Sequence, residues 1–337
     1  MHWTLSTALT ALLAYRAHSR KSLTFGGILA AVVTALVHAV HPFSTLNICL
    51  LFGFYLTGTS ATKHKHAIKQ SLTISATGSH TVTTRTHTQV FSNSICASVL
   101  ILIHYYLIQD DLNAGKDITF SLLSGGKNGW RDALVVGIMT QYAAVLSDTL
   151  SSELGILSRS PPRLIYNPLK VVPPGTNGGV TLAGFIAGTA GSIIIAIISV
   201  LSVPFSPENS NLQFKATLGG VIVAAGIGGT VIDSLLGATL QASVIDVKAG
   251  KVVESEGGEK VLVTSTKYPS IEGQIRKSVG VASEGQDVTA KTKAVGGGEG
   301  SRKIFNGFDL LSNNGVNVVM AGIAAVGGVL WGYWFVQ

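Results

Sequence analysis

The feature that most constrains this chain is a series of eight apolar runs separated by polar segments. About 20 apolar residues in a helix cross the hydrocarbon core of a bilayer, and all but the first run come near or above that length. Because lipid cannot satisfy open backbone groups, such runs cross it as helices. The pattern predicts an all-α polytopic integral membrane bundle of about seven or eight transmembrane helices, at residues 3–15, 23–40, 43–58, 88–108, 132–150, 178–203, 217–241 and 314–335.

The first run, residues 3–15, is short for a span. Its positive charges, Arg16, Arg20 and Lys21, follow the apolar core. In a cleaved signal peptide such charges come first. We therefore expect a retained anchor, and a thin span and an interfacial helix both stay open.

Composition agrees with a membrane protein. Charged residues make up 12% of the chain, against about 25% in soluble domains, and the mean hydropathy is +0.44. Cys49 and Cys96 lie inside apolar runs without a CxxC or Cys/His pattern. Neither a disulfide framework nor a zinc site is expected from them.

Positive charge gathers on alternate connections between the runs. With eight spans, the odd-numbered connections hold 20 of the 24 Lys and Arg residues. Cytosolic loops are enriched in Lys and Arg, so we expect four segments to face the cytosol: 16–21, 59–87, 151–177 and 242–312. The net charge of +7 is thereby explained as membrane orientation, and no nucleic-acid partner is expected.

This pattern divides the chain into three parts. Residues 1–243 form a transmembrane helical domain with inserted cytosolic loops at 59–87 and 151–177. Residues 244–312 are hydrophilic and partly flexible, with short alternating pieces that suggest a small hairpin, and residues 313–337 form the final span. Glycine stripes on 178–203 and 217–241 predict close helix packing and leave homo-oligomerisation open.

Several acids converge at the expected cytosolic face. Asp148 and Ser152 are four residues apart and share a helix face. Glu153 lies roughly 140° away on an ideal helix and joins them only if the helix loosens before Gly155. Asp233 lies about two turns inside its span. An acid near hydrocarbon is costly and suggests a function, although a structural acid bonded to neighbouring helices is the alternative.

Phosphate chemistry fits the residues around these acids. Carboxylate oxygens suit Mg²⁺ together with water and phosphate, and cationic side chains suit phosphate groups. The turn PPGTNGG precedes a helix and offers backbone N–H groups to an anion, but it is not a P-loop. The candidate phosphate-binding residues are Lys63, Arg85, Asn93, Lys170, Gly175, Thr176, Asn177, Gly178 and Asn317.

Six blocks carry a resemblance to a known family. They are GTSATKHK (58–65), RTHTQVFSN (85–93), LSDTLSSELG (146–155), VVPPGTNGGVTLAG (171–184), IGGTVIDSLLGATLQ (227–241) and LSNNGVNVV (311–319). They resemble the signature blocks of the family of transmembrane protein nineteen, formerly domain of unknown function 92. Its plant members are phytyl-phosphate kinases, and the chain departs from the family pattern over 264–303. The resemblance implies functional roles for Lys63, Arg85, Asn93, Asp148, Ser152, Glu153, Pro174, Gly175, Gly178, Asp233, Ser234 and Asn317.

The leading hypothesis is a kinase that converts an isoprenyl monophosphate to its diphosphate with a nucleoside triphosphate, CTP or another. Asp148, Ser152, Glu153 and Asp233 are the candidate catalytic residues, with the three acids holding Mg²⁺. The isoprenyl tail is expected between the glycine-striped spans. Nothing plastid-like precedes the first run, so phytol itself is not expected, and the endoplasmic reticulum or another endomembrane is the expected location.

Two other classes stay open. A transporter or channel for a small ion or metabolite would also use Asp148 and Asp233, with glycine-striped helices around them. A non-catalytic scaffold would recruit partners through 244–312. The acids lie towards one face and no inverted repeat is apparent between the two halves, which favours the kinase.

Overall fold

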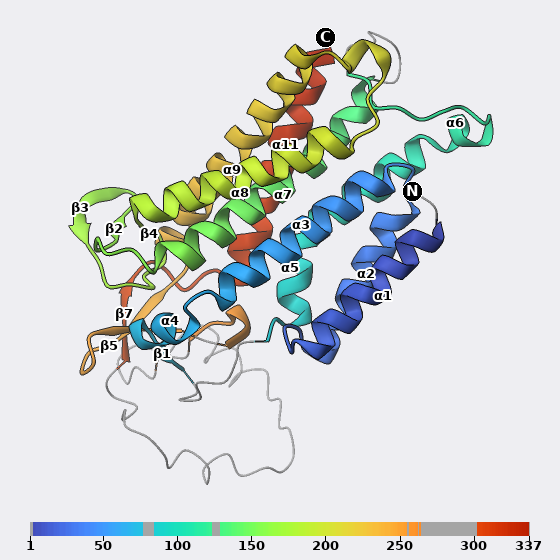
Figure 1. The fold of residues 1–337 in the computed structure, drawn as a ribbon. Coiled ribbons are helices and arrows are strands. Elements are labelled where there is room, and N and C mark those ends of the chain that lie inside the picture. Colours follow the sequence, from blue (N-terminus) through green and yellow to red (C-terminus); the bar gives the residue numbers. More distant parts are fainter. Residues whose placement is uncertain are drawn as a thin grey trace, which may run out of the picture.

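The computed structural model describes residues 3–76, 84–122, 129–254, 256–261, 263 and 302–336. Its long helices form a bundle, and short strands gather at one end (Figure 1). The long helices are α1 (Trp3–Ser19), α2 (Phe25–Val40), α3 (Ser44–Lys63), α5 (His87–Leu107), α7 (Gly129–Gly155), α8 (Leu182–Ser202), α9 (Leu212–Leu240) and α11 (Asn313–Val336). The connections hold short helices α4 (His66–Leu72) and α6 (Gln109–Asn113) and 3-10 turns η1 (Pro207–Asn209) and η2 (Glu256–Gly258).

Helix α7 is the centre of the bundle. It contacts α3, α5, α8, α9 and α11. Within its apolar stretch of 18 residues, 83% of the residues are buried. In the other four candidate spans, only 33–39% of the residues in the corresponding stretch are buried. These outer helices therefore bury one face and leave apolar side chains for lipid, whereas α7 is enclosed.

Five described helices are long and apolar enough to cross a bilayer: α5, α7, α8, α9 and α11. Helix α2 is apolar but holds only 16 residues, and α1 and α3 are not among the five. The predicted membrane-embedded helical bundle is confirmed. The predicted number of seven or eight spans stays a prediction.

Local sequence sets where several helices begin. Thr24, Thr181 and Asn211 each accept a backbone N–H of the first turn of α2, α8 and α9, respectively. Thr86 and Gln89 form a reciprocal capping box at the start of α5. These caps satisfy N–H groups that a helix leaves unpaired at its start. They explain why the helices begin close to the predicted apolar runs.

Glycine brings α8 against α7. An added Cβ at Gly188 would lie 2.9 Å from Ser147 Oγ, and one at Gly191 would lie 3.0 Å from the Leu146 carbonyl oxygen. An added Cβ at Gly184 would lie 2.9 Å from the Ser151 carbonyl oxygen. No side chain fits at these distances, so the predicted glycine stripe on this helix is confirmed as a packing face.

Two small sheets lie at one end of the bundle (Figure 1). One has the order β1-β6-β5-β7, with β1 (Ile74–Ser75) parallel to β6 (Lys251–Glu254), and β5 (Ser243–Asp246) antiparallel to both β6 and β7 (Arg302–Asn306). The other has the order β3-β2-β4, from β2 (Arg163–Leu164), β3 (Asn167–Val171) and β4 (Gly179–Val180). Of the two alternating pieces expected to form a hairpin, KVVE (251–254) is strand β6 and pairs instead with β5, whereas most of KVLVTSTK (260–267) lies outside the described residues. Strand β1 joins β6 to the segment after α3.

Helix direction brings the predicted cytosolic segments together. Helices α3, α7 and α9 end, and α5, α8 and α11 begin, at the end of the bundle that carries the strands (Figure 1). The segments after α3, α7 and α9 therefore share one end. This arrangement agrees with the alternation of charge in the sequence, although which compartment that end faces stays a prediction.

A buried chain of polar side chains connects a turn and two helices at the opposite end of the bundle. His41 Nε2 lies 2.7 Å from His104 Nδ1, and His104 Nε2 lies 3.0 Å from Asp132 Oδ1. The backbone N–H of Phe43 donates to His41 Nδ1 at 2.9 Å. In the neutral ring, His41 must then donate from Nε2, so His104 accepts at Nδ1 and donates from Nε2 to Asp132. The chain links the α2–α3 turn to α5 and α7.

Candidate functional site

A polar cavity of about 570 Å³ lies at the strand-bearing end of the bundle. Its walls come from α5, α7, α9, α11 and the turn between β3 and β4. It brings together most of the residues that the sequence singled out: Arg85, Asn93, Asp148, Ser152, Glu153, Pro174, Gly175, Thr176, Asn177, Gly178, Asp233, Ser234 and Asn317. We call this space the carboxylate cavity.

A second polar cavity of about 650 Å³ adjoins it. Arg85, Gln89, Glu153, Gly175 and Glu254 are among the residues that line both spaces. The second cavity is otherwise walled by the start of α5, by strands β5 and β6, and by residues 257–261. The two spaces are therefore neighbouring lobes of one polar region, large enough together for more than one ligand.

Asp148 of α7 and Asp233 of α9 meet in the carboxylate cavity. Their carboxyl groups lie within hydrogen-bonding reach of one another. Asp233 Oδ1 is buried without a hydrogen-bond partner among the described residues. Two carboxylates at this separation repel unless they share a proton or a cation. The pair, with an open oxygen beside a cavity that has room for water and phosphate, fits a Mg²⁺ ion.

Small residues make that meeting of acids geometrically possible. An added Cβ at Gly229 of α9 would clash with Ala144 of α7, and one at Gly226 would lie 3.1 Å from the Ala143 carbonyl oxygen. Thr230 Oγ1 donates to Ser147 Oγ at 2.7 Å between the same helices. The two helices therefore approach closely one turn before each acid.

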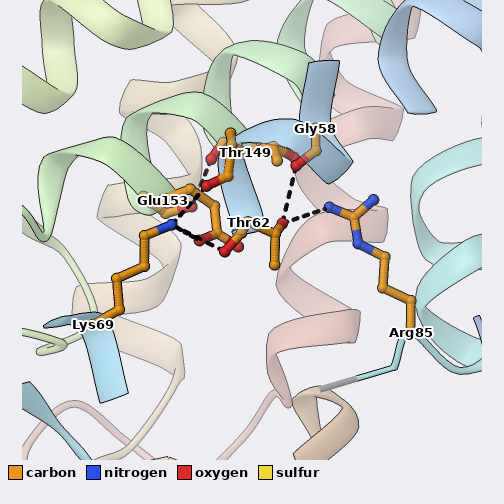
Figure 2. A network of polar contacts seen from close by, with 8 residues as sticks. Gly58, Thr62, Lys69, Arg85, Thr149 and Glu153 are labelled. Atoms are coloured by element: carbon orange, nitrogen blue, oxygen red, sulfur yellow. Dashed lines mark hydrogen bonds and ion pairs between the residues drawn. The ribbon is translucent and has the colours of Figure 1, made fainter. Parts of the chain in front are cut away.

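Glu153 has a different partner from the other two acids. Lys69 Nζ of α4 lies 2.7 Å from Glu153 Oε2, and it also donates to the carbonyl oxygens of Ala61 at 2.7 Å and Thr62 at 3.3 Å. Figure 2 shows this contact on one side of Thr62 and Arg85 on the other. Lys69 thus neutralises Glu153 and satisfies carbonyl groups at the end of α3.

The ion pair corrects one expectation about the metal. In the described residues, no group of three His, Cys, Asp or Glu side chains is placed to hold an ion. Helix α7 stays helical through Glu153 to Gly155, so the helix does not loosen in the way that a shared ion required. Glu153 is therefore held by Lys69 and does not join the Asp148–Asp233 pair.

Arg85 is the predicted cation that lines the carboxylate cavity. Its backbone bridges to the α1–α2 connection, since its N–H donates to the Ser22 carbonyl oxygen at 3.1 Å and its carbonyl oxygen accepts from Thr24 at 3.0 Å. Its Nη2 donates to Thr62 Oγ1 at 3.2 Å, and the guanidinium lies 5.9 Å from the Phe54 ring centroid. Burial lowers the pKa of Arg85, and nearby Glu153 opposes this effect. Arginine remains charged under such conditions.

The other two predicted cations lie elsewhere. Lys63 Nζ donates to the Arg20 carbonyl oxygen at 3.4 Å, and Lys170 lies on exposed strand β3 with its Nζ 5.2 Å from the Phe305 ring centroid. Neither lines the two polar cavities. Arg159 lines the carboxylate cavity instead. In the sequence, Arg159 was counted only among the Lys and Arg residues of the segment 151–177, which indicate membrane orientation.

The PPGTNGG turn lines the cavity but uses much of its own hydrogen-bonding capacity. The N–H groups of Thr176 and Gly179 donate within the turn, and that of Asn177 donates to Ser243 Oγ at 2.9 Å. Gly175 and Gly178 have positive φ angles of 84° and 71°, and a Cβ at Gly178 would meet Ala238 of α9. The N–H groups of Thr176, Asn177 and Gly179 are therefore already used and are not free to cradle a phosphate. The turn docks α9 and β5 against the cavity.

Amide side chains complete the wall formed by α5, α7 and α11. Asn317 Nδ2 donates to Asn93 Oδ1 at 3.3 Å, and Gln141 Nε2 donates to the Asn93 carbonyl oxygen at 2.7 Å. Ser152 is exposed, and its hydroxyl donates to the Thr149 carbonyl oxygen at 3.2 Å. Asn93 and Asn317 are thereby fixed to one another beside the acids.

Sequence reasoning assigned no role in the site to Lys69 or Glu254. Glu254 ends β6 and lines both lobes. Desolvation by the surrounding protein raises the pKa of Glu254, a hydrogen bond with Thr73 lowers it, and nearby Glu153 raises it further. Both residues lie in polar segments, and in the sequence only the charge of each side chain distinguished it. Their partners depend on how those segments fold back onto α7.

The chain has recognisable relatives. A family described as integral membrane protein DUF92 matches residues 8–325. Protein PGR of Arabidopsis thaliana is 34% identical over 251 residues, which cover 74% of this chain and 82% of that relative. An uncharacterized membrane protein of Methanocaldococcus jannaschii is 37% identical over 124 residues, 37% of this chain and 46% of that relative. No solved structure matches the chain.

Proposed function

The chain belongs to the DUF92 family of integral membrane proteins, and we propose that it is a membrane-embedded isoprenyl-phosphate kinase. It would transfer a phosphoryl group from a nucleoside triphosphate, CTP or another, to an isoprenyl monophosphate. The single observation that carries the proposal is the Asp148–Asp233 carboxyl pair in a polar cavity that Arg85 also lines.

Each residue has a defined task in this proposal. Asp148 and Asp233 would hold Mg²⁺, which neutralises phosphate charge and helps to align the reacting groups when it is bound. Arg85 and Arg159 would bind phosphate oxygens, because guanidinium groups match their geometry. Glu153 would act indirectly, by fixing Lys69, α4 and the end of α3 around the cavity.

The transfer itself needs little acid–base chemistry. An oxygen of the acceptor monophosphate forms a bond to the terminal phosphorus of the donor. The bond from that phosphorus to its bridging oxygen breaks, and a nucleoside diphosphate leaves. The acceptor oxygen is already ionised at neutral pH, so positioning and charge neutralisation supply most of the catalysis. The two adjoining lobes give separate room for donor and acceptor.

The position of the cavity suits a soluble donor and a membrane-dissolved acceptor. It lies at the end of the bundle where the Lys- and Arg-rich segments gather. By the positive-inside rule, we expect that end to face the cytosol. A location in the endoplasmic reticulum or another endomembrane belongs to the same proposal, since isoprenyl phosphates dissolve in such membranes.

A transfer assay tests the proposal. Purified protein would be incubated with Mg²⁺, each labelled nucleoside triphosphate, and farnesyl, geranylgeranyl, phytyl or dolichyl monophosphate. The proposal expects label in the diphosphate of at least one lipid, with loss of the signal on chelation of Mg²⁺. Transfer to none of the four lipids from any nucleotide would contradict it.

A transporter is the second candidate, because Asp148 and Asp233 lie on helices long enough to span a membrane. One observation counts against it. On the far side of Asp148, residues 135–147 of α7 are all buried, so this stretch of the helix is closed to solvent. Uptake of a small ion into vesicles that is lost in both Asp148→Asn and Asp233→Asn, without any phosphoryl transfer, would favour the transporter.

A further inference from the structure

A narrow apolar cleft of about 60 Å³ runs between α1, α2, α3 and α5. Its walls are largely aliphatic, and small residues of α1 and α2 form much of them, including Ala14, Ala17, Ala31 and Ala35. At one end the cleft meets three polar residues, Arg85, Gln89 and Asn93. These three also line the carboxylate cavity. The apolar cleft and the polar cavity therefore share a wall.

We propose that this cleft holds the isoprenyl chain of the lipid phosphate, with its phosphate placed between Arg85 and the Asp148–Asp233 pair. The proposal rests on the proposed kinase function and adds the site of the lipid tail. A space of about 60 Å³ admits only a few carbon atoms of one linear chain, so the rest of an isoprenyl chain enters only where α1 moves aside. The occupant is thus a single-chain anionic lipid.

The polar boundary is built to receive a negative head group. The Arg85 guanidinium is held against Phe54 and Thr62, at 5.9 Å from the ring centroid and 3.2 Å from the hydroxyl oxygen. Gln89 is fixed by the capping box of α5, where its Oε1 accepts the Thr86 N–H at 3.0 Å. A positive charge therefore sits at the point where the apolar surface ends, which matches a phosphate ester on a hydrocarbon chain.

The alternative place for the tail, between the glycine-striped helices α8 and α9, is filled. Gly188 and Gly191 pack on α7, and an added Cβ at Gly226 of α9 would clash with Ser192 of α8. Glycine brings these backbones into contact and leaves no room for a chain. The sequence-based expectation for the tail is therefore replaced by the cleft on the other side of α7.

Access from the bilayer is available on the α1 side. The extensive contacts of α1 are with α2 alone among the described elements, and Leu12 and Tyr15 of α1 are 57% and 70% exposed. A helix held along one side can separate from its other neighbours at low cost. A chain dissolved in the membrane could then slide between α1 and α3.

Substitution within the cleft tests the proposal by binding. Ala31→Phe places a ring in the cleft, whereas Val33→Phe adds a similar ring on the same helix at a side chain that is 53% exposed. Binding of geranylgeranyl monophosphate and of isopentenyl monophosphate would be measured for both variants and the unmodified protein. We expect Ala31→Phe to weaken binding of the long chain at least tenfold and of the short chain less than twofold, with Val33→Phe unchanged.

Photo-crosslinking of the unmodified protein gives a second measurement that does not depend on variant folding. A geranylgeranyl monophosphate with a diazirine at the far end of its chain should label peptides of α1 and α2. Label on α8 and α9, equal binding of the long chain by Ala31→Phe, or no binding at all would overturn the tail site. Phosphoryl transfer that Ala31→Phe leaves intact would overturn the tail site and retain the kinase. Tail labelling on α1 and α2 without phosphoryl transfer would support the tail site and contradict the kinase.

Discussion

The acids of the cavity differ in what balances their charge. Glu153 is neutralised by Lys69 at 2.7 Å, whereas Asp148 and Asp233 have chiefly one another. A carboxyl pair that lacks a cationic partner of its own favours a bound cation or a shared proton. We therefore expect the Asp148–Asp233 pair to carry the chemistry and the Lys69–Glu153 pair to support the structure beside it.

Removal of Lys69 tests this structural role. Lys69→Met leaves Glu153 without its lysine partner and removes the Lys69 donor from the Ala61 and Thr62 carbonyl oxygens at the end of α3. Loss of one partner of a largely buried pair should lower the free energy of unfolding by roughly 2 kcal/mol, a value reduced because Glu153 is partly exposed. Thermal unfolding in detergent measures it. The Lys69→Met, Glu153→Gln double variant should recover part of the loss. Lys116→Met, in an exposed pair with Asp111, should show none.

The raised pKa of Glu254 gives a stability effect that depends on pH. The folded protein prefers the protonated carboxyl, so its contribution is fully favourable below the ordinary pKa of 4.5 and is lost as pH rises through the folded pKa. Glutamine has no carboxyl group to ionise, so Glu254→Gln does not lose stability in this way as pH rises. The variant should melt at a higher temperature than the unmodified protein at pH 7.5, and the two should converge below pH 4.5. An equal difference at both pH values would show that desolvation of the carboxylate is not the cause.

The sequence alone singled out the charged residues that lie within apolar helices. Asp148 and Asp233 are acids within apolar runs, so their cost could be recognised directly. Lys69 could not be singled out, because it acts through the fold of α4 back onto α7, 84 positions away in sequence. Lys170 was selected for its charge, and only the strand geometry of β3 shows it to be exposed.

At the scale of elements, close packing of α7, α8 and α9 sets the distance between the two aspartates. Gly226 and Gly229 bring α9 to α7 one or two turns before Asp233, and Gly188 brings α8 to Ser147, the residue before Asp148. Small residues at helix contacts let backbones approach where lipid offers no hydrophobic drive. The acid pair depends on glycines that do not line the cavity.

Gly188→Ala tests this dependence. Its Cβ would lie 2.9 Å from Ser147 Oγ and 3.0 Å from the Ser147 carbonyl oxygen, so α8 must move away from α7. We expect a loss of about 1–3 kcal/mol in the free energy of unfolding, typical of overpacking, and a loss of activity larger than the fraction unfolded explains. Gly228→Ala is the matched control, since its Cβ meets nothing within 4 Å. Equal melting temperatures for the two variants would refute a packing role for Gly188.

The helices were more predictable than the strands for a physical reason. A helix that crosses lipid needs a long apolar run, so the run itself predicts where the helix lies. The expected span 88–108 is found as His87–Leu107, and the span 314–335 is found as Asn313–Val336. Strand β1 pairs with β6, which lies about 180 positions later. Such short strands have no periodicity of their own, and their pairing depends on the bundle that brings the loops together.

At the scale of the whole molecule, the protein combines three spaces at one end of a helix bundle. Two polar lobes carry the acids and cations, and an apolar cleft adjoins them at Arg85. The enclosed part of α7 separates this end from the buried histidine chain at the other. A one-sided site with both polar and apolar walls suits an enzyme that joins a soluble donor to a lipid acceptor.

The most direct test of this account is phosphoryl transfer by Asp148→Asn compared with the unmodified protein. The amide keeps the shape of the side chain and removes the charge that a cation needs, so activity should fall at least 100-fold. Membrane insertion and melting temperature should stay near those of the unmodified protein. Asp117→Asn, an exposed acid at the other end of the bundle, is the control and should retain full activity. Full activity in Asp148→Asn would contradict the central role of the carboxyl pair.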